Sequence, residues 1–360
     1  MTALQRRYIR LLRAYPPGYP REELLGTLLA AAPPDRSRPP AREAANLIRH
    51  GLRARLGRPA SRTVVFWALA ATVIGALFGA AFAVRAGWET TPPLPGPERT
   101  RAMSMEILPD LAWTDASAPP PAQFIIYGQP LDWSMARDLL LGDGGEYSQA
   151  AVGAWVPGGP HAERDKAVAD AQANLEAKGW AVYPVRYSDA YSCGGPPCDP
   201  ASIPRDATLA ARRGGLFVTV EVFAESTADT TFVAASFQRT TPAAVWPCGI
   251  AGGLLAGLAA FALFAWASRR TDGERHRARG AVKKFFGTGL LLWWAPTLFA
   301  LPLMVLHHIQ EPHPSWHPMW EWFGQPTFSL FFVAGGGCIL LALALAALPR
   351  RRPEAFPVPA

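Results

Sequence analysis

The sequence predicts a membrane α-helical protein with four transmembrane helices, a small α+β extracytoplasmic domain and an N-terminal helical cytoplasmic module. Three observations support this fold class: four long apolar runs, a charge that changes sign between the segments that join them, and a polar region of about 160 residues between the first two runs. Each run has about the 20 residues that a helix needs to cross a bilayer. The predicted spans are 63–84, 246–268, 286–307 and 328–348.

The formal net charge of +7 is an average over segments of opposite sign. Residues 1–62 contain thirteen arginines and four acidic residues, and residues 87–245 contain eleven basic and nineteen acidic residues. Residues 269–285 are again basic, with seven basic and two acidic residues. Because basic residues beside a span favour the cytoplasmic side, we expect a multi-pass protein of the cell (plasma) membrane with both termini in the cytoplasm.

A cleaved signal peptide is the alternative interpretation of the first apolar run. About sixty residues precede this run, and the run is longer than the apolar core of a signal peptide. We therefore expect 63–84 to remain as a transmembrane helix.

The segment 1–62 predicts a basic module of amphipathic helices over 3–15, 21–31 and 41–56. Two interpretations stay open: the helices lie on anionic lipid head groups, or they dock a cytosolic partner. Direct binding of nucleic acid is not expected, because the module is tethered to the membrane. The candidate docking residues are Leu11, Leu28, Arg49 and Arg53.

The run Tyr8-Ile-Arg-Leu-Leu-Arg-Ala-Tyr-Pro-Pro-Gly-Tyr-Pro20, followed by Leu24-Leu-Gly-Thr-Leu-Leu29, resembles a known helical module. Modules of this HAAS-type or permease-prefix kind open many actinobacterial membrane proteins. The resemblance covers about the first 58 residues, and it implies a PadR-like transcriptional repressor or a transport permease as partner. It transfers no catalytic residue.

The region between the first two spans predicts an extended stalk rich in proline and alanine, residues 85–121, and an α+β domain, residues 122–245. We expect helices on one face of a sheet. No nucleophile motif or phosphate-binding loop occurs in this region, so we expect no enzyme activity. The predicted elements are a helix over 162–178 and strands over 125–127, 180–187, 216–223 and 231–237.

Two cysteines lie close together in the extracytoplasmic domain. Cys193 and Cys198 flank Gly-Gly-Pro-Pro, which suits a tight reversal, and this compartment permits disulfides. A disulfide is our prediction, and a zinc half-site is the alternative. Cys248 and Cys338 lie in apolar runs at different depths, and we expect both to be free thiols.

The four predicted spans contain no Asp, Glu, Lys or Arg. Charged residues inside a membrane usually mark ion pathways and proton relays, so their absence argues against an ion-coupled transporter. Glycines at a spacing of four predict close helix packing instead: Gly75 and Gly79 in the first span, and Gly253 and Gly257 in the second. Pro296 and Pro302 predict a kink in the third span, either as a packing adjustment or as a hinge.

The predicted outer loop 308–327 and the residue before it are rich in histidine and tryptophan. The histidines could bind Zn²⁺ or Cu²⁺, while the tryptophans equally fit an aromatic belt at the membrane surface. No other cofactor is expected. The candidate ligands are His307, His308, His313 and His317.

These observations favour a non-enzymatic signalling or regulatory membrane protein, with an outward sensing domain and a cytoplasmic docking head. The alternative is a permease-like subunit that works with an ATPase, because the layout resembles that of FtsX/MacB-type permeases. A purely structural envelope protein is a third interpretation. The candidate partners are the lipid bilayer, a PadR-like cytosolic regulator or an ATPase, and a second copy of the chain.

Overall fold

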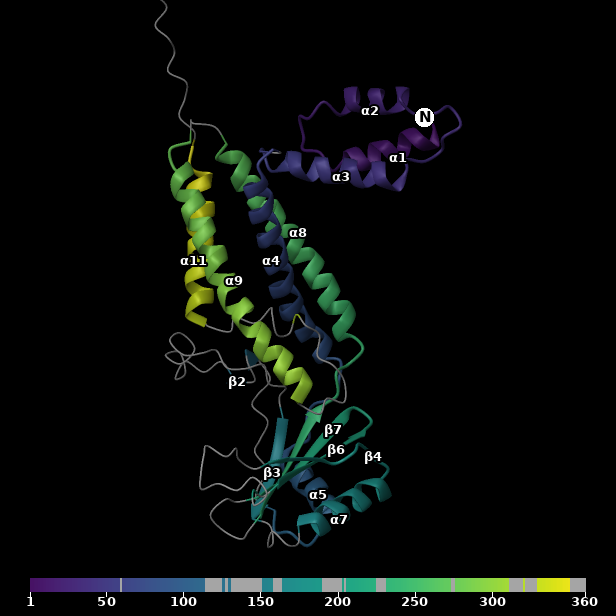
Figure 1. The fold of residues 1–360 in the computed structure, drawn as a ribbon, viewed down its shortest axis with the longest axis vertical. Helices are drawn as coiled ribbons and strands as arrows, with labels where there is room; N and C mark the ends of the chain where they lie inside the picture. The colour runs from purple at the N-terminus through teal and green to yellow at the C-terminus, as the bar shows by residue number, and fades with distance from the viewer. Residues whose placement is uncertain are drawn as a thin grey trace, which may run out of the picture.

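In the part of the chain that the structure describes, there are a helical head, four long helices and a sheet domain. Figure 1 shows the head at one end of the long helices and the sheet domain at the other end. The computed structural model describes residues 1–58, 60–113, 125–126, 129–130, 151–157, 164–189, 203, 205–224, 231–272, 276–310, 320 and 329–349.

The head consists of α1 (Ala3–Leu12), α2 (Arg21–Ala30) and α3 (Ala41–Arg55), which cover the three helices expected from the sequence. Their apolar faces meet in a small core, because leucines and tyrosines recur at helical spacing. Arg55 of α3 donates hydrogen bonds from Nε to the carbonyl of Ala14 (2.5 Å) and from Nη2 to that of Arg13 (2.6 Å), next to the end of α1. The buried core residues are Leu4, Tyr8, Leu12, Tyr15 and Leu47.

The four long helices coincide with the four apolar runs. They are α4 (Arg62–Trp88), α8 (Val245–Arg270), α9 (Arg279–Gln310) and α11 (Ser329–Ala347). Among the described residues, α4 and α8 have the length and apolar composition to cross a membrane. Helix α9 runs through Pro296 and Pro302.

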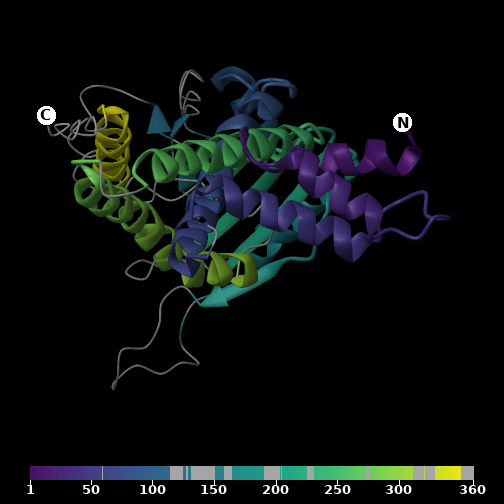
Figure 2. The ribbon, with the colours of Figure 1, turned by 90° about the horizontal axis from the view of Figure 1, so that it is seen from above.

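The long helices pack as two pairs, α4 with α8 and α9 with α11. Two side-chain hydrogen bonds join the two pairs, and a third lies within the pair of α9 and α11. Trp294 Nε1 of α9 donates to the carbonyl of Ala70 in α4 (3.1 Å). Arg270 Nε of α8 donates to the carbonyl of Ala346 at the end of α11 (2.9 Å). Trp293 Nε1 of α9 donates to the carbonyl of Phe332 in α11 (3.0 Å). Viewed from above, the head extends on the side of α4 and α8 that is away from α11 (Figure 2).

The sheet domain contains an antiparallel sheet with the order β3-β8-β7-β6-β4, and β5 also pairs with β6. Strands β6, β7 and β8 form two consecutive antiparallel hairpins. Gly214 (φ 58°) lies in the turn between β6 and β7, where a positive φ favours glycine. A separate short hairpin joins β1 (Ile125–Ile126) and β2 (Gln129–Pro130). The strands of the main sheet are β3 (Ala151–Pro157), β4 (Ala181–Val182), β5 (Arg186–Asp189), β6 (Arg205–Arg213), β7 (Leu216–Ala224) and β8 (Thr231–Arg239).

Helices α5 (Pro97–Ile107) and α7 (Arg164–Ala177) supply the helical side of the sheet domain's core. Ile107 of α5 and Leu175 of α7 share this core with strand residues such as Val220. Alternate residues of β8 are buried, as the two-residue period of a half-covered strand requires, whereas β6 buries the consecutive residues 209–211 and β7 buries both 217 and 218. The α+β architecture expected for this region is present.

The structure differs from the sequence predictions at three places in this domain. The prediction of an extended stalk over 85–121 is wrong for α5, because Met103 and Ile107 lie one turn apart and join the core. The predicted strand 180–187 is divided into β4 and β5 around Pro184, which has no N–H to donate to a sheet. Strands β3 and β6 were not predicted, since β3 contains two alanines and a glycine and β6 contains three alanines, and both residue types have a low strand propensity.

Candidate functional site

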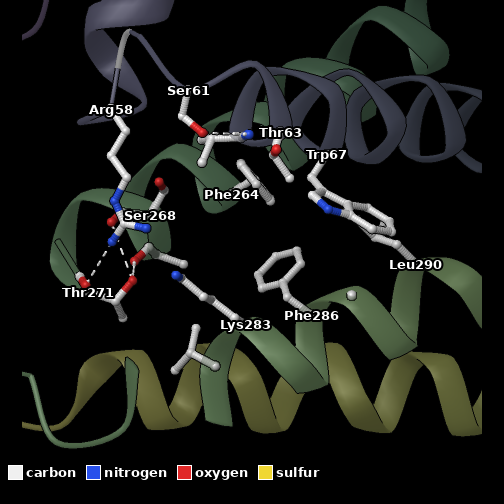
Figure 3. Close-up of a pocket in the computed structure, with 14 residues that line it drawn as sticks. Arg58, Ser61, Thr63, Trp67, Phe264, Ser268, Thr271, Lys283, Phe286 and Leu290 are labelled. Carbon is white, nitrogen blue, oxygen red and sulfur yellow. Dashed lines mark hydrogen bonds between the residues drawn. The ribbon is translucent and has the colours of Figure 1, made fainter. Parts of the chain in front are cut away.

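A cavity of about 380 Å³ lies among α4, α8 and α9, near the junction with the head. Figure 3 shows the side chains that surround it. Its volume is within the range of small-molecule sites in proteins. The lining residues are Arg58, Ser61, Thr63, Val64, Trp67, Phe264, Ala267, Ser268, Thr271, Val282, Lys283, Phe286, Gly287 and Leu290.

The polar groups of the cavity gather at one end. Figure 3 shows the guanidinium of Arg58 beside Ser268 and Thr271, with the amine of Lys283 directed toward them. These residues come from three segments: the connection between α3 and α4, the last turn of α8, and the first turns of α9. The polar end therefore forms where the ends of α4, α8 and α9 meet the basic segments of the chain beside them.

Hydrogen bonds fix this end of the cavity. Arg58 Nε donates to Asp272 Oδ1 (2.8 Å), and its Nη2 donates to the carbonyl of Thr271 (3.0 Å). The hydroxyl of Ser268 donates to the carbonyl of Leu56 (2.7 Å). The chain that leaves the head is thus bound to the end of α8, and an added Cβ at Gly57 (φ 76°) would lie 2.8 Å from Arg269 Cγ.

The cavity has an excess of positive charge among the described residues. Partial desolvation of its ammonium lowers the pKa of Lys283, and the nearby charges of Arg279 and Arg58 lower it further. Lys283 precedes the apolar part of α9 and forms no ion pair with a described carboxylate. Asp272 pairs with Arg58 and its side chain is 43% exposed, so it offsets only part of the local charge.

The opposite end of the cavity is apolar. Trp67 of α4 and Leu290 of α9 lie there, away from Arg58, and Phe286 lies between the two ends (Figure 3). Phe286 and Leu290 also belong to the buried cluster that joins the two helix pairs. The cavity therefore combines a cationic end with an apolar end.

The size of this cavity and its mixed lining suit the binding of a small molecule. The described lining contains no histidine, cysteine or carboxylate. Three of its hydroxyls already serve structural hydrogen bonds, because Ser61 caps α4 at Val64 N (3.3 Å) and Thr271 donates to the carbonyl of Ala267 (2.8 Å), as Ser268 does to Leu56. These three hydroxyls therefore help to hold the local fold of the cavity wall.

The predicted docking residues lie on different faces of the head. Leu11 and Leu28 are half-buried against the head's own core. Arg49 is exposed and Arg53 is half-buried on α3. A partner of the head would thus meet Arg49 directly, whereas the two leucines contribute mainly to folding of the head. Their role in docking stays a prediction.

The structure brings the four predicted packing glycines together along the contact between α4 and α8. An added Cβ at Gly75 would lie 2.7 Å from Ala260 Cβ, and one at Gly79 would lie 2.1 Å from Ala256 Cβ. At Gly253 and Gly257 the nearest atoms of α4 would be 3.2 Å and 3.1 Å away. The two helices approach more closely than larger side chains would allow.

Several predicted site residues lie outside the described residues. They are Cys193 and Cys198 of the predicted disulfide, and His313 and His317 of the predicted metal site. The backbone of His307 and His308 belongs to the last turns of α9, and their side chains lie outside the described part of the structure. Cys248 and Cys338 are free, as expected, and both are half-buried. The disulfide and the metal site stay predictions.

Sequence reasoning missed the cavity, although a signal for it exists. Arg58 and Lys283 stand just before apolar runs, and Ser268 and Thr271 stand at or just beyond the end of another. The predicted topology puts all four at the same membrane surface, but their contact depends on how the helices pack, which the order of the spans does not give. No protein-family model, no curated protein and no solved structure matches the chain.

Proposed function

We propose that the chain is a non-enzymatic, four-span protein of the cell membrane that transmits a state of its outward α+β domain to a cytoplasmic docking head. The apolar composition of α4 and α8 supports insertion of these two helices. The apolar runs of α9 and α11, which carry no charged residue over 286–307 and 328–348, support insertion of the other two. The basic segments at the head end support a cytoplasmic location for the head and both termini.

One observation carries the proposal: the packed pair of α4 and α8 is bound to the head at one end and to the sheet domain at the other. At the head end, Arg58 and Leu56 form hydrogen bonds with the last turn of α8 and the residues after it. At the sheet end, Arg239 Nη1 of β8 donates to the carbonyl of Trp88 (3.1 Å) and to Thr91 Oγ1 (3.3 Å). A rigid pair with contacts at both ends is an element that can couple two distant sites.

The close glycine and alanine contacts between α4 and α8 support rigid-body movement of this pair. Interfaces packed this closely shift between discrete arrangements and do not deform gradually. A change in the sheet domain that moved Trp88 would therefore also move Arg58 at the other end of the pair.

The permease alternative also has an observation in its favour. The connection between α8 and α9 carries basic residues, and Asp272 in this connection binds Arg58 of the head-to-helix connection. A cytosolic ATPase that contacted this connection would therefore be coupled directly to the long helices. This version of the proposal predicts an ATPase as partner, where the signalling version predicts a DNA-binding regulator of the PadR-like kind.

Photo-crosslinking of the full-length protein in its native membrane separates these alternatives. A crosslinking amino acid replaces the exposed Arg49, and a second variant carries it at the exposed Arg99 of α5. We expect cytosolic proteins on the first variant and extracytoplasmic material on the second. A DNA-binding regulator crosslinked at position 49 would support the signalling version. An ATPase crosslinked at the same position would support the permease alternative. Lipid as the sole product would reduce the head to a membrane anchor and contradict both versions.

A further inference from the structure

The cavity beside Arg58 has the chemical layout of a site for an amphiphile. Its polar end presents Arg58, Lys283 and the hydroxyl groups of the last turn of α8, and its other end presents Trp67 and Leu290 (Figure 3). In a four-span arrangement the polar end lies at the cytoplasmic membrane surface, and the apolar end lies within the hydrocarbon region. A bilayer lipid has its head group and its acyl chains at these same two depths.

The charge of the polar end selects among lipids. The cations near it are Arg58, Lys283 and Arg279, and the described carboxylate that faces them is Asp272, which Arg58 binds. Two cations therefore have no described carboxylate partner. Basic pockets between transmembrane helices on the cytoplasmic side bind anionic lipid head groups.

We propose that this cavity binds an anionic phospholipid, with its phosphate beside Lys283 and Arg58 and the start of one acyl chain against Trp67, Phe286 and Leu290. The cavity of about 380 Å³ holds the head group and the upper part of a chain, and the remainder of the lipid extends into the bilayer between the two helix pairs. The inference rests on the proposed insertion of the long helices and is independent of any signal from the sheet domain.

The apolar end makes a phospholipid a better occupant than a free phosphate ion. A free phosphate gains electrostatic attraction at Lys283 but leaves the surfaces of Trp67 and Leu290 uncovered. An acyl chain fills the apolar end and makes van der Waals contacts with these side chains, which add to the binding free energy. The same phosphate chemistry thus predicts tighter binding when it is attached to a chain.

Native mass spectrometry of the full-length protein in neutral detergent tests the proposal. The protein is titrated with phosphatidylglycerol, with phosphatidylcholine and with inorganic phosphate. We expect retention of phosphatidylglycerol in preference to phosphatidylcholine, and no displacement of the lipid by inorganic phosphate at the same concentration. Equal binding of the two lipids would overturn the assignment of an anionic ligand, and displacement by phosphate would overturn the assignment of a lipid.

Two pairs of variants locate the site. Lys283→Gln should weaken phosphatidylglycerol binding about fivefold, the effect of one basic residue near an anionic head group. Lys284→Gln removes the same charge one residue later, outside the cavity lining, and should leave binding unchanged. Equal losses in both variants would mean a non-specific surface charge and would overturn the site.

The second pair of variants places a leucine at Gly287, which lines the cavity, or at Gly280, which does not. An added Cβ at Gly287 or at Gly280 meets no atom within 4 Å, and only Gly287 lines the cavity. Gly287→Leu should abolish retention of phosphatidylglycerol, while Gly280→Leu on the same helix should not. Circular dichroism of each variant checks that the fold is kept. Retention of the lipid by a folded Gly287→Leu variant would contradict the proposal, whatever partner the head binds.

Discussion

Tyr8 shows how one buried polar side chain organises the head. Its ring is fully buried, and its hydroxyl donates to Glu43 Oε1 (2.6 Å). The other carboxylate oxygen of Glu43 is 3.5 Å from Arg36 Nη1, so α1, α3 and the connection between α2 and α3 meet at this point. A buried hydroxyl without a partner would be costly, and Glu43 supplies the partner.

Ionisation of Tyr8 should destabilise the head at high pH. Burial raises the pKa of Tyr8 above 10.0, and the hydrogen bond and negative charge of Glu43 raise it further, while Arg36 opposes them. A phenol with a raised pKa in the folded state contributes its full stability below the pKa of the unfolded state and loses it as the pH rises toward the folded value. The contribution of Tyr8 to the stability of the head should therefore be constant up to about pH 9 and decrease above about pH 10.

Absorbance at the phenolate wavelength, compared between the full-length protein and Tyr8→Phe, isolates the titration of this residue. Glu43→Gln should bring the pKa of Tyr8 closer to its ordinary value. At neutral pH, Tyr8→Phe should reduce the stability of the head by about 1 kcal/mol, because it removes one hydrogen bond. A phenol that titrates at or below its ordinary value would contradict the buried contact.

At the scale of elements, the contact between α4 and α8 depends on residues without side chains. An added Cβ at Gly79 would lie 2.1 Å from Ala256 Cβ and 2.8 Å from the carbonyl oxygen of Gly252. An added Cβ at Gly337 of α11 meets nothing within 4 Å. The same substitution should therefore have opposite effects on the two helices.

Gly79→Ala should destabilise the protein by about 1 to 3 kcal/mol, since two backbones must separate to admit the methyl group. Gly337→Ala should be neutral or should stabilise it by up to about 1 kcal/mol, since alanine is the better helix former. Unfolding of the detergent-solubilised protein, followed by circular dichroism, measures both changes. Equal stability of the two variants would mean that α4 and α8 do not pack at Gly79.

The elements that could be predicted from the sequence are those with a local signal. The apolar runs produce long helices, the glycine spacing places Gly79 at a helix contact, and the helical period marks α7. Helix α5 was missed because the prolines around it dominate the local composition, and β6 because its alanines mask a strand. The cavity was missed for another reason: Arg58, Ser268 and Lys283 are far apart in the sequence, and only the packing of three helices brings them together.

At the scale of the whole molecule, α4 and α8 connect two domains that make separate cores. The head core is built from leucines and tyrosines of α1 to α3, and the sheet domain has its own core of strand and helix residues. Where the pair meets the sheet domain, the guanidinium of Arg239 lies 5.5 Å from the centre of the Trp88 ring, in addition to its two hydrogen bonds. Trp88 also packs with Val84 of α4 and Val245 of α8, so movement of Arg239 reaches both helices.

Loosening the sheet end of this pair should therefore be detectable in the head. Arg239→Ala removes the contacts to Trp88 and Thr91, with an expected local loss of about 1 to 2 kcal/mol. Hydrogen exchange of the full-length protein in lipid nanodiscs should rise around residues 88–91 and, to a smaller extent, in α3. Gly57→Ala is the positive control, because a side chain at this positive φ (76°) strains the connection between the head and α4 directly. The increase of hydrogen exchange in α3 of this variant gives the scale for the increase in Arg239→Ala.

Arg213→Ala is the matched control for Arg239→Ala. Arg213 makes the same kinds of contact inside the sheet domain, with a hydrogen bond to the carbonyl of Lys178 (3.0 Å) and its guanidinium 4.6 Å from the centre of the Trp180 ring. Its loss should raise exchange near Lys178 and leave α3 unchanged, because neither contact involves α4 or α8. If Arg239→Ala raised exchange at 88–91 but not in α3, the two domains would be independent, and the proposed transmission along α4 and α8 would fail while the lipid site beside Lys283 would stand.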